Sequence, residues 1–139
     1  MRTITVVSLV GSMVLAVLLA ACAGYTETGP KTTSHQGATG GDVTVEISKA
    51  NGTSSKDIEV EGGSDLTLEA DVTLAVGKGS YKIELLGQDD QVTLALEARD
   101  GQTVSGHGQM ATDSFGQAGY RVTAVDAENV DYTIQYTFQ

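Results

Sequence analysis

From Asp42 to its last residue, the chain alternates apolar and polar side chains, and this pattern limits its possible folds more than any other feature. The final residues show it best, because every second residue from 130 to 138 is apolar and those between are polar. In a β-strand, successive side chains point to opposite faces of the sheet. A period of two therefore predicts strands that bury one face and expose the other.

Further runs share this period, at residues 43–47, 58–60, 66–76, 81–85, 92–98 and 118–124. Short segments containing Gly or Asp separate them, among them Asn51-Gly52, Gly77-Lys78-Gly79 and Asp100-Gly101, and such segments are typical of turns. Seven or eight short strands with one apolar face each need a second sheet to cover that face. The sequence therefore predicts one all-β domain over residues 42–139, an antiparallel β-sandwich. A small β-barrel is the alternative.

The first 22 residues have a different character. Arg2 precedes a long apolar run over residues 4–21, a layout typical of a signal peptide. The run ends in Leu19-Ala20-Ala21-Cys22, which resembles the lipobox of bacterial lipoproteins: a branched apolar residue, two small residues and a cysteine. The resemblance implies removal of residues 1–21 and attachment of lipid to the Cys22 thiol. An ordinary secretory signal and a retained membrane helix are the alternatives.

The lipobox resemblance also predicts a location. A lipidated Cys22 would hold the chain to a membrane on its extracytoplasmic side. Ala23 follows the cysteine, at the place where an Asp retains lipoproteins of two-membrane bacteria in the inner membrane. We therefore expect the outer membrane where the source has one, and the cell membrane otherwise.

Residues 22–41 separate the predicted anchor from the predicted domain. This segment is rich in Gly, Thr and Ser, contains the only proline and shows no apolar period. Such a composition cannot bury enough apolar surface to order a chain. The sequence therefore predicts a disordered linker here, with His35 in solvent.

The chain is strongly acidic. Its net charge is −10, and removal of Arg2 with the signal leaves seven Lys and Arg against eighteen Asp and Glu, which is −11. Recognition of nucleic acid needs a basic surface, so we expect no nucleic-acid partner. Cys22 is the only cysteine, so no disulfide forms within the chain.

Few side chains of the predicted domain have the chemistry of a catalytic centre. His107 is its only histidine, and a glycine on either side predicts an exposed loop. Ser105 lies two residues away without the motif of a nucleophile elbow. Asp89-Asp90 is typical of a turn. We therefore predict that the protein is not an enzyme and has no catalytic residue.

Oxygen-bearing side chains gather near the end of the sequence. Asp126, Glu128, Asn129 and Asp131 offer four such side chains within six residues, and calcium prefers oxygen ligands from a loop. They are the candidate calcium ligands. Asp89, Asp90 and Asp113 are a second group if their loops meet at one end of the domain. The chain contains no zinc-type cluster, and no other cofactor is predicted.

Residues 113–122, which read Asp-Ser-Phe-Gly-Gln-Ala-Gly-Tyr-Arg-Val, resemble the stretch that enters a late strand in immunoglobulin-like sandwiches. The same stretch and the final Tyr-x-Ile-x-Tyr strand are similar to bacterial pre-peptidase C-terminal sandwiches. The first resemblance implies that the Tyr120 hydroxyl bonds back to the preceding corner. Both imply a sandwich and assign no function.

These features together predict a lipid-anchored, non-catalytic interaction or structural module of the bacterial envelope, with an envelope protein as its partner. A ligand- or calcium-binding module, for a glycan or a cationic peptide, is the first alternative, and a small hydrolase is the second. The runs at residues 42–48 and 132–139 are long enough to pair with a partner strand if they lie at sheet edges. The tyrosines at 81, 120, 132 and 136 share the apolar parity and are expected in the core.

Overall fold

The computed structural model describes residues 24–139, which form seven β-strands and one short 3-10 helix. The predicted signal peptide, its cleavage residues Leu19, Ala20 and Ala21, and the lipidation site Cys22 lie outside the described residues. The elements are β1 (Tyr25–Thr28), β2 (Lys31–Gln36), β3 (Gly40–Glu59), β4 (Thr67–Leu86), η1 (Gln88–Asp90), β5 (Val92–Arg99), β6 (Thr103–Ala111) and β7 (Gln117–Phe138).

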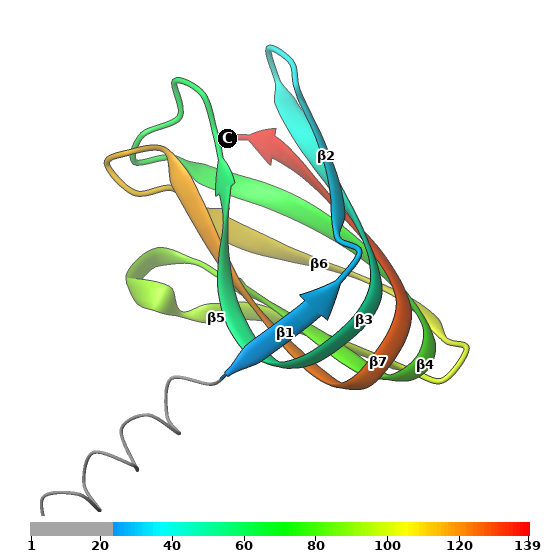
Figure 1. The fold of residues 1–139 in the computed structure, drawn as a ribbon. Helices are drawn as coiled ribbons and strands as arrows, with labels where there is room; N and C mark the ends of the chain where they lie inside the picture. The colour runs from blue at the N-terminus through cyan, green and yellow to red at the C-terminus, as the bar shows by residue number, and fades with distance from the viewer. Residues whose placement is uncertain (1–23) are drawn as a thin grey trace, which may run out of the picture.

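Three long strands organise the fold (Figure 1). β7 lies in the middle and pairs antiparallel with β3 on one side and with β4 on the other, along nearly its whole length. β1 and β2 pair with β3, and β5 and β6 pair with β4. All pairings are antiparallel, and they connect the seven strands into one sheet.

Each long strand bends sharply near its middle, so the single sheet folds over into two layers. The bends carry register shifts at residues 50–52 of β3 and 78–80 of β4. Gly52 and Gly79 have φ of 101° and 74°, a backbone region that glycine enters at low cost. The sequence predicted turns at these places, which is wrong: the strands continue through them, because β7 follows β3 and β4 round the bend.

The first layer contains β2, β6 and residues 40–47, 67–76 and 130–138 of the long strands. The second contains β5 and residues 53–59, 80–86 and 117–125, with β1 lying across the bend of β3. The predicted antiparallel β-sandwich is therefore confirmed. Its seven strands agree with the predicted number, but two of them precede the predicted domain and three are longer than the turn signals indicated.

The apolar side chains of both layers point inward and form one core. Leu68, Leu74, Ile83 and Ile134 are fully buried within it. The four tyrosines at 81, 120, 132 and 136 are also buried, as predicted from their parity. Burial of 25 apolar residues in one cluster gives the domain its hydrophobic stabilisation without a disulfide.

Tyrosine hydroxyls meet inside this core. The rings of Tyr81 and Tyr132 stack at a centroid distance of 5.8 Å. The Tyr120 hydroxyl lies 3.0 Å from that of Tyr132, so each satisfies the other. The resemblance to immunoglobulin-like sandwiches implied a hydrogen bond from the Tyr120 hydroxyl back to the preceding corner. In the structure, this hydroxyl bonds to Tyr132 of the other layer instead.

The segment predicted as a disordered linker contains two strands. β1 and β2 pair with β3 through backbone groups, and every residue of β2 is exposed. Backbone pairing at a sheet edge needs no apolar period, which is why the polar composition misled the prediction. Tyr25 of β1 also packs against the core, and its hydroxyl oxygen lies 3.4 Å from that of Tyr81.

The predicted sheet edges are wrong as well. Residues 42–48 and 132–139 belong to β3 and β7, which have strands on both sides there. Within residues 24–139, no helix has the length and apolar character needed to cross a membrane.

Candidate functional site

The two lateral sides of the sandwich differ, and this difference locates the candidate site. On the side of β5 and β6, side chains seal the space between the layers. Leu94 of β5 packs against Gly108 of β6, where a Cβ atom would lie only 2.7 Å from the Leu94 Cβ. The Thr93 hydroxyl accepts a hydrogen bond from the Gln109 backbone N–H at 3.2 Å, and it also donates to the Gln109 carbonyl. Close packing and these hydrogen bonds therefore join the two layers on this side.

On the opposite side, a groove of about 520 Å³ runs between β2 and the second half of β3. Its floor consists of Val43, Ile58 and Tyr136, which also belong to the core. Thr32 and Ser34 of β2 form one wall. The groove exists because β2 extends the first layer, whereas no strand among residues 24–139 occupies the matching position in the second layer.

The second wall is an unpaired backbone edge. The Thr53 N–H donates to the Gly24 carbonyl at 3.1 Å, and this is the last bond that the β1 side makes to β3. In an antiparallel ladder, alternate residues turn their N–H and C=O groups to opposite sides. Ser55, Asp57 and Glu59 share the parity of Thr53, so their backbone groups face the groove. No residue from 24 to 139 pairs with them on that side.

A side chain closes the far end of this edge. The Gln36 amide accepts a hydrogen bond from the Glu61 backbone N–H at 3.0 Å and donates to the Glu61 carbonyl at 2.9 Å. The amide thus imitates the backbone of a neighbouring strand. Its carboxamide oxygen is also 3.5 Å from the Tyr136 hydroxyl on the groove floor. Gln36 therefore bridges the two walls and sets the length of the groove.

The rim of the groove is acidic. Asp57, Glu59 and Glu61 line it together with His35, and its lining residues include neither lysine nor arginine. Sequence reasoning missed this site because it depends on which strand lacks a neighbour. The available signal was that residues 57, 59 and 61 are all acidic and alternate with apolar residues. Their side chains are exposed on the outer face, beside the buried Ile58.

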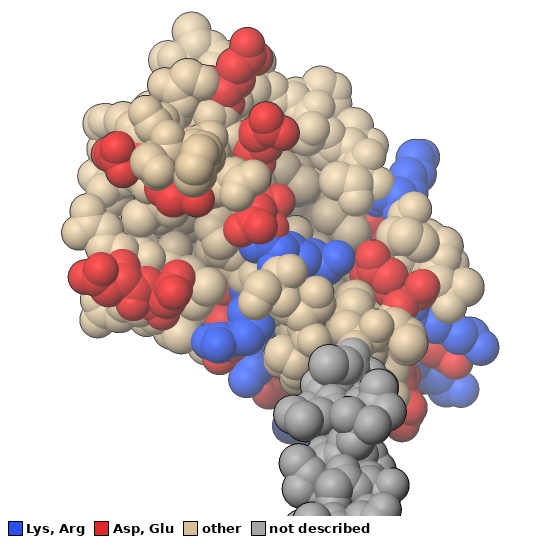
Figure 2. Space-filling model, turned by 60° about the vertical axis from the view of Figure 1, so that its left-hand side comes forward, with Lys and Arg blue, Asp and Glu red and all other residues tan. Residues whose placement is uncertain are grey.

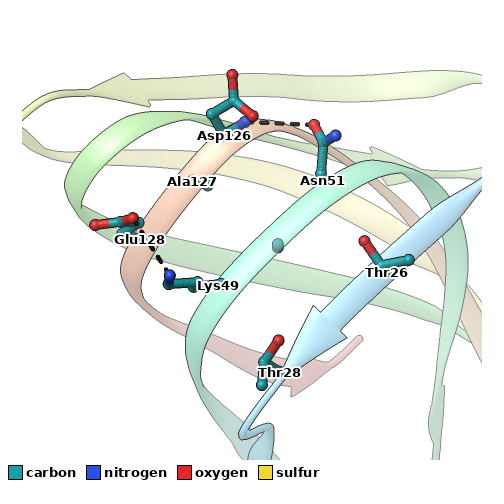
Figure 3. A pocket seen from close by; sticks show the side chains of 8 residues that line it. Thr26, Thr28, Lys49, Asn51, Asp126, Ala127 and Glu128 are labelled. Atoms are coloured by element: carbon teal, nitrogen blue, oxygen red, sulfur yellow. Dashed lines mark hydrogen bonds and ion pairs between the residues drawn. The ribbon is translucent and has the colours of Figure 1, made fainter.

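The structure brings two of the four candidate calcium ligands into one hollow. Asp126 and Glu128 line a hollow at the bend of β3 and β7, but Lys49 lies in it, and its ammonium is 3.9 Å from the Glu128 carboxylate (Figure 3). The Asp126 backbone N–H donates to the Asn51 amide oxygen.

The other two candidates lie apart from this hollow. Asn129 is exposed at the bend with φ of 52°. Asp131 stands opposite Glu46 on the outer face of the first layer. Among residues 24–139, no group of three His, Cys, Asp or Glu side chains is arranged to hold a metal ion.

The second predicted acidic group does meet at one end of the domain. Asp89, Asp90 and Asp113 line a hollow of about 390 Å³ together with Asp57 and Asp65. Their loops join there because both layers end at this point. The Asp113 carboxylate is occupied locally, since it accepts hydrogen bonds from the backbone N–H groups of Phe115 and Gln117.

His107 lies in β6, not in the predicted loop. Its imidazole is bound between two carboxylates of β4, with Nε2 2.6 Å from Glu69 and Nδ1 2.8 Å from Asp71. Hydrogen bonds from Asp71 and Glu69 raise the pKa of His107. The flanking glycines serve the close packing against Leu94 described above.

His107 also belongs to a regular polar face, the outer face of the first layer. Two rows of side chains cross all five strands of this layer in register. The first row consists of hydroxyl side chains. The second has a histidine at each end, with acid and amide side chains alternating between them. The first row is Thr33, Thr44, Thr133, Thr73 and Ser105. The second row is His35, Asp42, Gln135, Asp71 and His107. Neighbouring hydroxyls bond within the first row, as in the 3.1 Å contact of Thr44 with Thr133.

No family model and no curated protein matches the chain. Among solved structures, it is similar to a carbohydrate-binding module of Cellvibrio mixtus lichenase 5A, with 14% identity over 81% of this chain and 88% of that one, at a TM-score of 0.36. It is also similar to the CBM22-1 xylan-binding domain of Paenibacillus barcinonensis Xyn10C, with 13% identity, coverage of 84% and 86%, and a TM-score of 0.40. A third similar structure is that of Bacillus endospore appendages, disulfide-linked pili, with 14% identity, coverage of 82% and 95%, and a TM-score of 0.43. These likenesses concern the arrangement of strands and identify no binding residue in this chain.

Proposed function

We propose that this chain is a lipid-anchored, non-catalytic binding module on the extracytoplasmic side of a bacterial envelope membrane, and that it holds a partner protein in the groove between β2 and β3. The observation that carries this proposal is the asymmetry of the sandwich. One lateral side is sealed by Leu94 and Thr93, whereas the other is left open beside an unpaired backbone edge. Exposed strand edges invite pairing with another chain, and proteins normally cover them.

The position of the anchor supports the proposal. Cys22 of the lipobox precedes Gly24 by two residues, which span at most about 7 Å. The Gly24 carbonyl is bonded to Thr53, so a lipid on Cys22 would hold the domain close to the bilayer and not on a long tether. Figure 2 shows Lys and Arg side chains among Asp and Glu side chains, which extend over the whole face shown.

The anchor is tested by metabolic labelling with a palmitate analogue in the native host. We expect label on the full-length protein and none on the Cys22→Ala variant. Equal labelling of both would contradict lipidation at this residue.

The groove is tested by photo-crosslinking in the same cells. A photo-reactive residue replaces Ser34 in the groove wall or, as the matched control, Ser105 on the outer face of the first layer; both serines are exposed. We expect one dominant protein crosslink from position 34, absent from position 105 and lost with Cys22→Ala. Equal crosslinking at both positions, or none at position 34, would refute the binding role of the groove.

A further inference from the structure

We infer that the occupant of the groove is an extended segment of the partner protein, with basic and apolar side chains in alternation, that adds to β3 as a strand of the second layer. This inference rests on the proposed function and specifies the chemistry of the partner.

The first argument is the empty strand position. Five strands lie side by side in the first layer, and β2 is the one at the groove. In the second layer, β1 pairs with β3 only as far as Gly52, so the residues beyond it have β7 alone as a neighbour within residues 24–139. A strand placed there would lie opposite β2 and would complete the second layer to the same width.

The second argument is the backbone. Ser55, Asp57 and Glu59 each turn one N–H and one C=O to the groove, and an added strand would pair with all of them. At a rise of about 3.4 Å per residue, the free edge is roughly 17 Å long, which is enough for five residues. The Gln36 amide already pairs in this manner with Glu61, the next residue of the same parity. Gln36 therefore marks the end of the segment.

The third argument is the pattern of side chains. On the inner face of β3, Ile58 is buried beside Val43, so an inward side chain of an added strand would meet an apolar floor there. Lys56, the other inward residue of this edge, is already paired with Glu27. On the outer face, Asp57 and Glu59 are exposed. Opposite charges on neighbouring strands stabilise pairing, and like charges oppose it. The segment that fits both faces alternates apolar with basic residues.

The test uses the detergent-solubilised full chain and a fluorescent peptide of alternating lysine and valine, Lys-Val-Lys-Val-Lys-Val-Lys, at physiological ionic strength. Fluorescence anisotropy measures binding. One control peptide has glutamate in place of lysine. A second keeps all side chains but carries N-methyl groups on alternate residues, which removes the backbone donors of one edge. We expect the parent peptide to bind at least tenfold more tightly than either control.

Protein variants give the matching comparison. Proline is tolerated where its missing N–H faces away from the ladder, which is the case for Ser55. We expect Ser55→Pro to lose binding at least tenfold and Ser55→Ala to retain it. Asp57→Asn with Glu59→Gln keeps the edge and should weaken binding of the lysine peptide alone. The peptide comparison needs no variant, so it stands if Ser55→Pro fails to fold.

Three results would overturn the inference. Equal binding of the N-methylated peptide would show charge attraction without strand pairing, and absence of binding by the lysine peptide would remove the basic strand as the occupant. A dimer in sedimentation velocity that Ser55→Pro disrupts would make a second copy of the chain the occupant. A crosslink from position 34 to a partner would still support the proposed function in the first two cases, so the two failures are distinguishable.

Discussion

The paired hydroxyls of Tyr120 and Tyr132 allow a sharp test of how the core is held together. Both side chains are buried, with exposed fractions of 3% and 1%, and their hydroxyl oxygens are 3.0 Å apart. Tyr132→Phe removes one hydroxyl and leaves that of Tyr120 without this partner. An unsatisfied buried hydroxyl costs about 1–3 kcal/mol, whereas removal of both partners is nearly neutral. We therefore expect a large loss of stability for Tyr132→Phe and a smaller one for the double variant with Tyr120→Phe.

The assay is urea unfolding of the full chain in a mild detergent, followed by far-ultraviolet circular dichroism. With a slope of about 1–3 kcal/mol per molar urea, the single variant should unfold at roughly 1 M less urea than the original protein. The two single variants and the double variant complete a cycle that measures the coupling between the hydroxyls. If the two losses are simply additive, the hydroxyls do not satisfy one another and the reasoning is refuted.

Two further predictions concern β6. Because Asp71 and Glu69 raise the pKa of His107, the charged imidazole stabilises the fold fully below about pH 6.5, and this contribution is lost as the pH rises through the raised pKa of the folded state. An NMR titration of the imidazole should show the raised pKa, and a value at or below 6.5 would contradict the bridge. Gly108→Ala places a Cβ 2.7 Å from the Leu94 Cβ and should destabilise the protein by about 1–3 kcal/mol in the urea assay. An unchanged midpoint of urea unfolding would mean that β5 and β6 can move apart at little cost in free energy.

The strands and their buried faces could be predicted from the sequence because alternation records burial directly. Val43, Leu74 and Ile134 each lie in the core as their parity indicated. The bends could not be predicted in this way. Gly77-Lys78-Gly79 has the composition of a turn, and a glycine with positive φ serves equally in a turn or a bulge. Only the path of β7 beside β4 decides between them.

The site could be predicted even less. β2 is polar throughout, and it is a strand only because β3 offers it a backbone edge. The groove follows from the same circumstance, since it is the space beside β3 that no strand of residues 24–139 fills. The calcium prediction relied on Asp126 and Glu128 being close in sequence. Their side chains line the same hollow, but the ammonium group of Lys49, which comes from β3, also lies there and pairs with Glu128.

The central place of β7 has a consequence for how the chain reaches its native state. β3 and β4 do not pair with each other, and both need β7, which follows them in the sequence. Neither layer can be completed before β7 has been synthesised, and contacts between such distant segments form slowly. During synthesis, β3 and β4 therefore emerge before the strand that joins them.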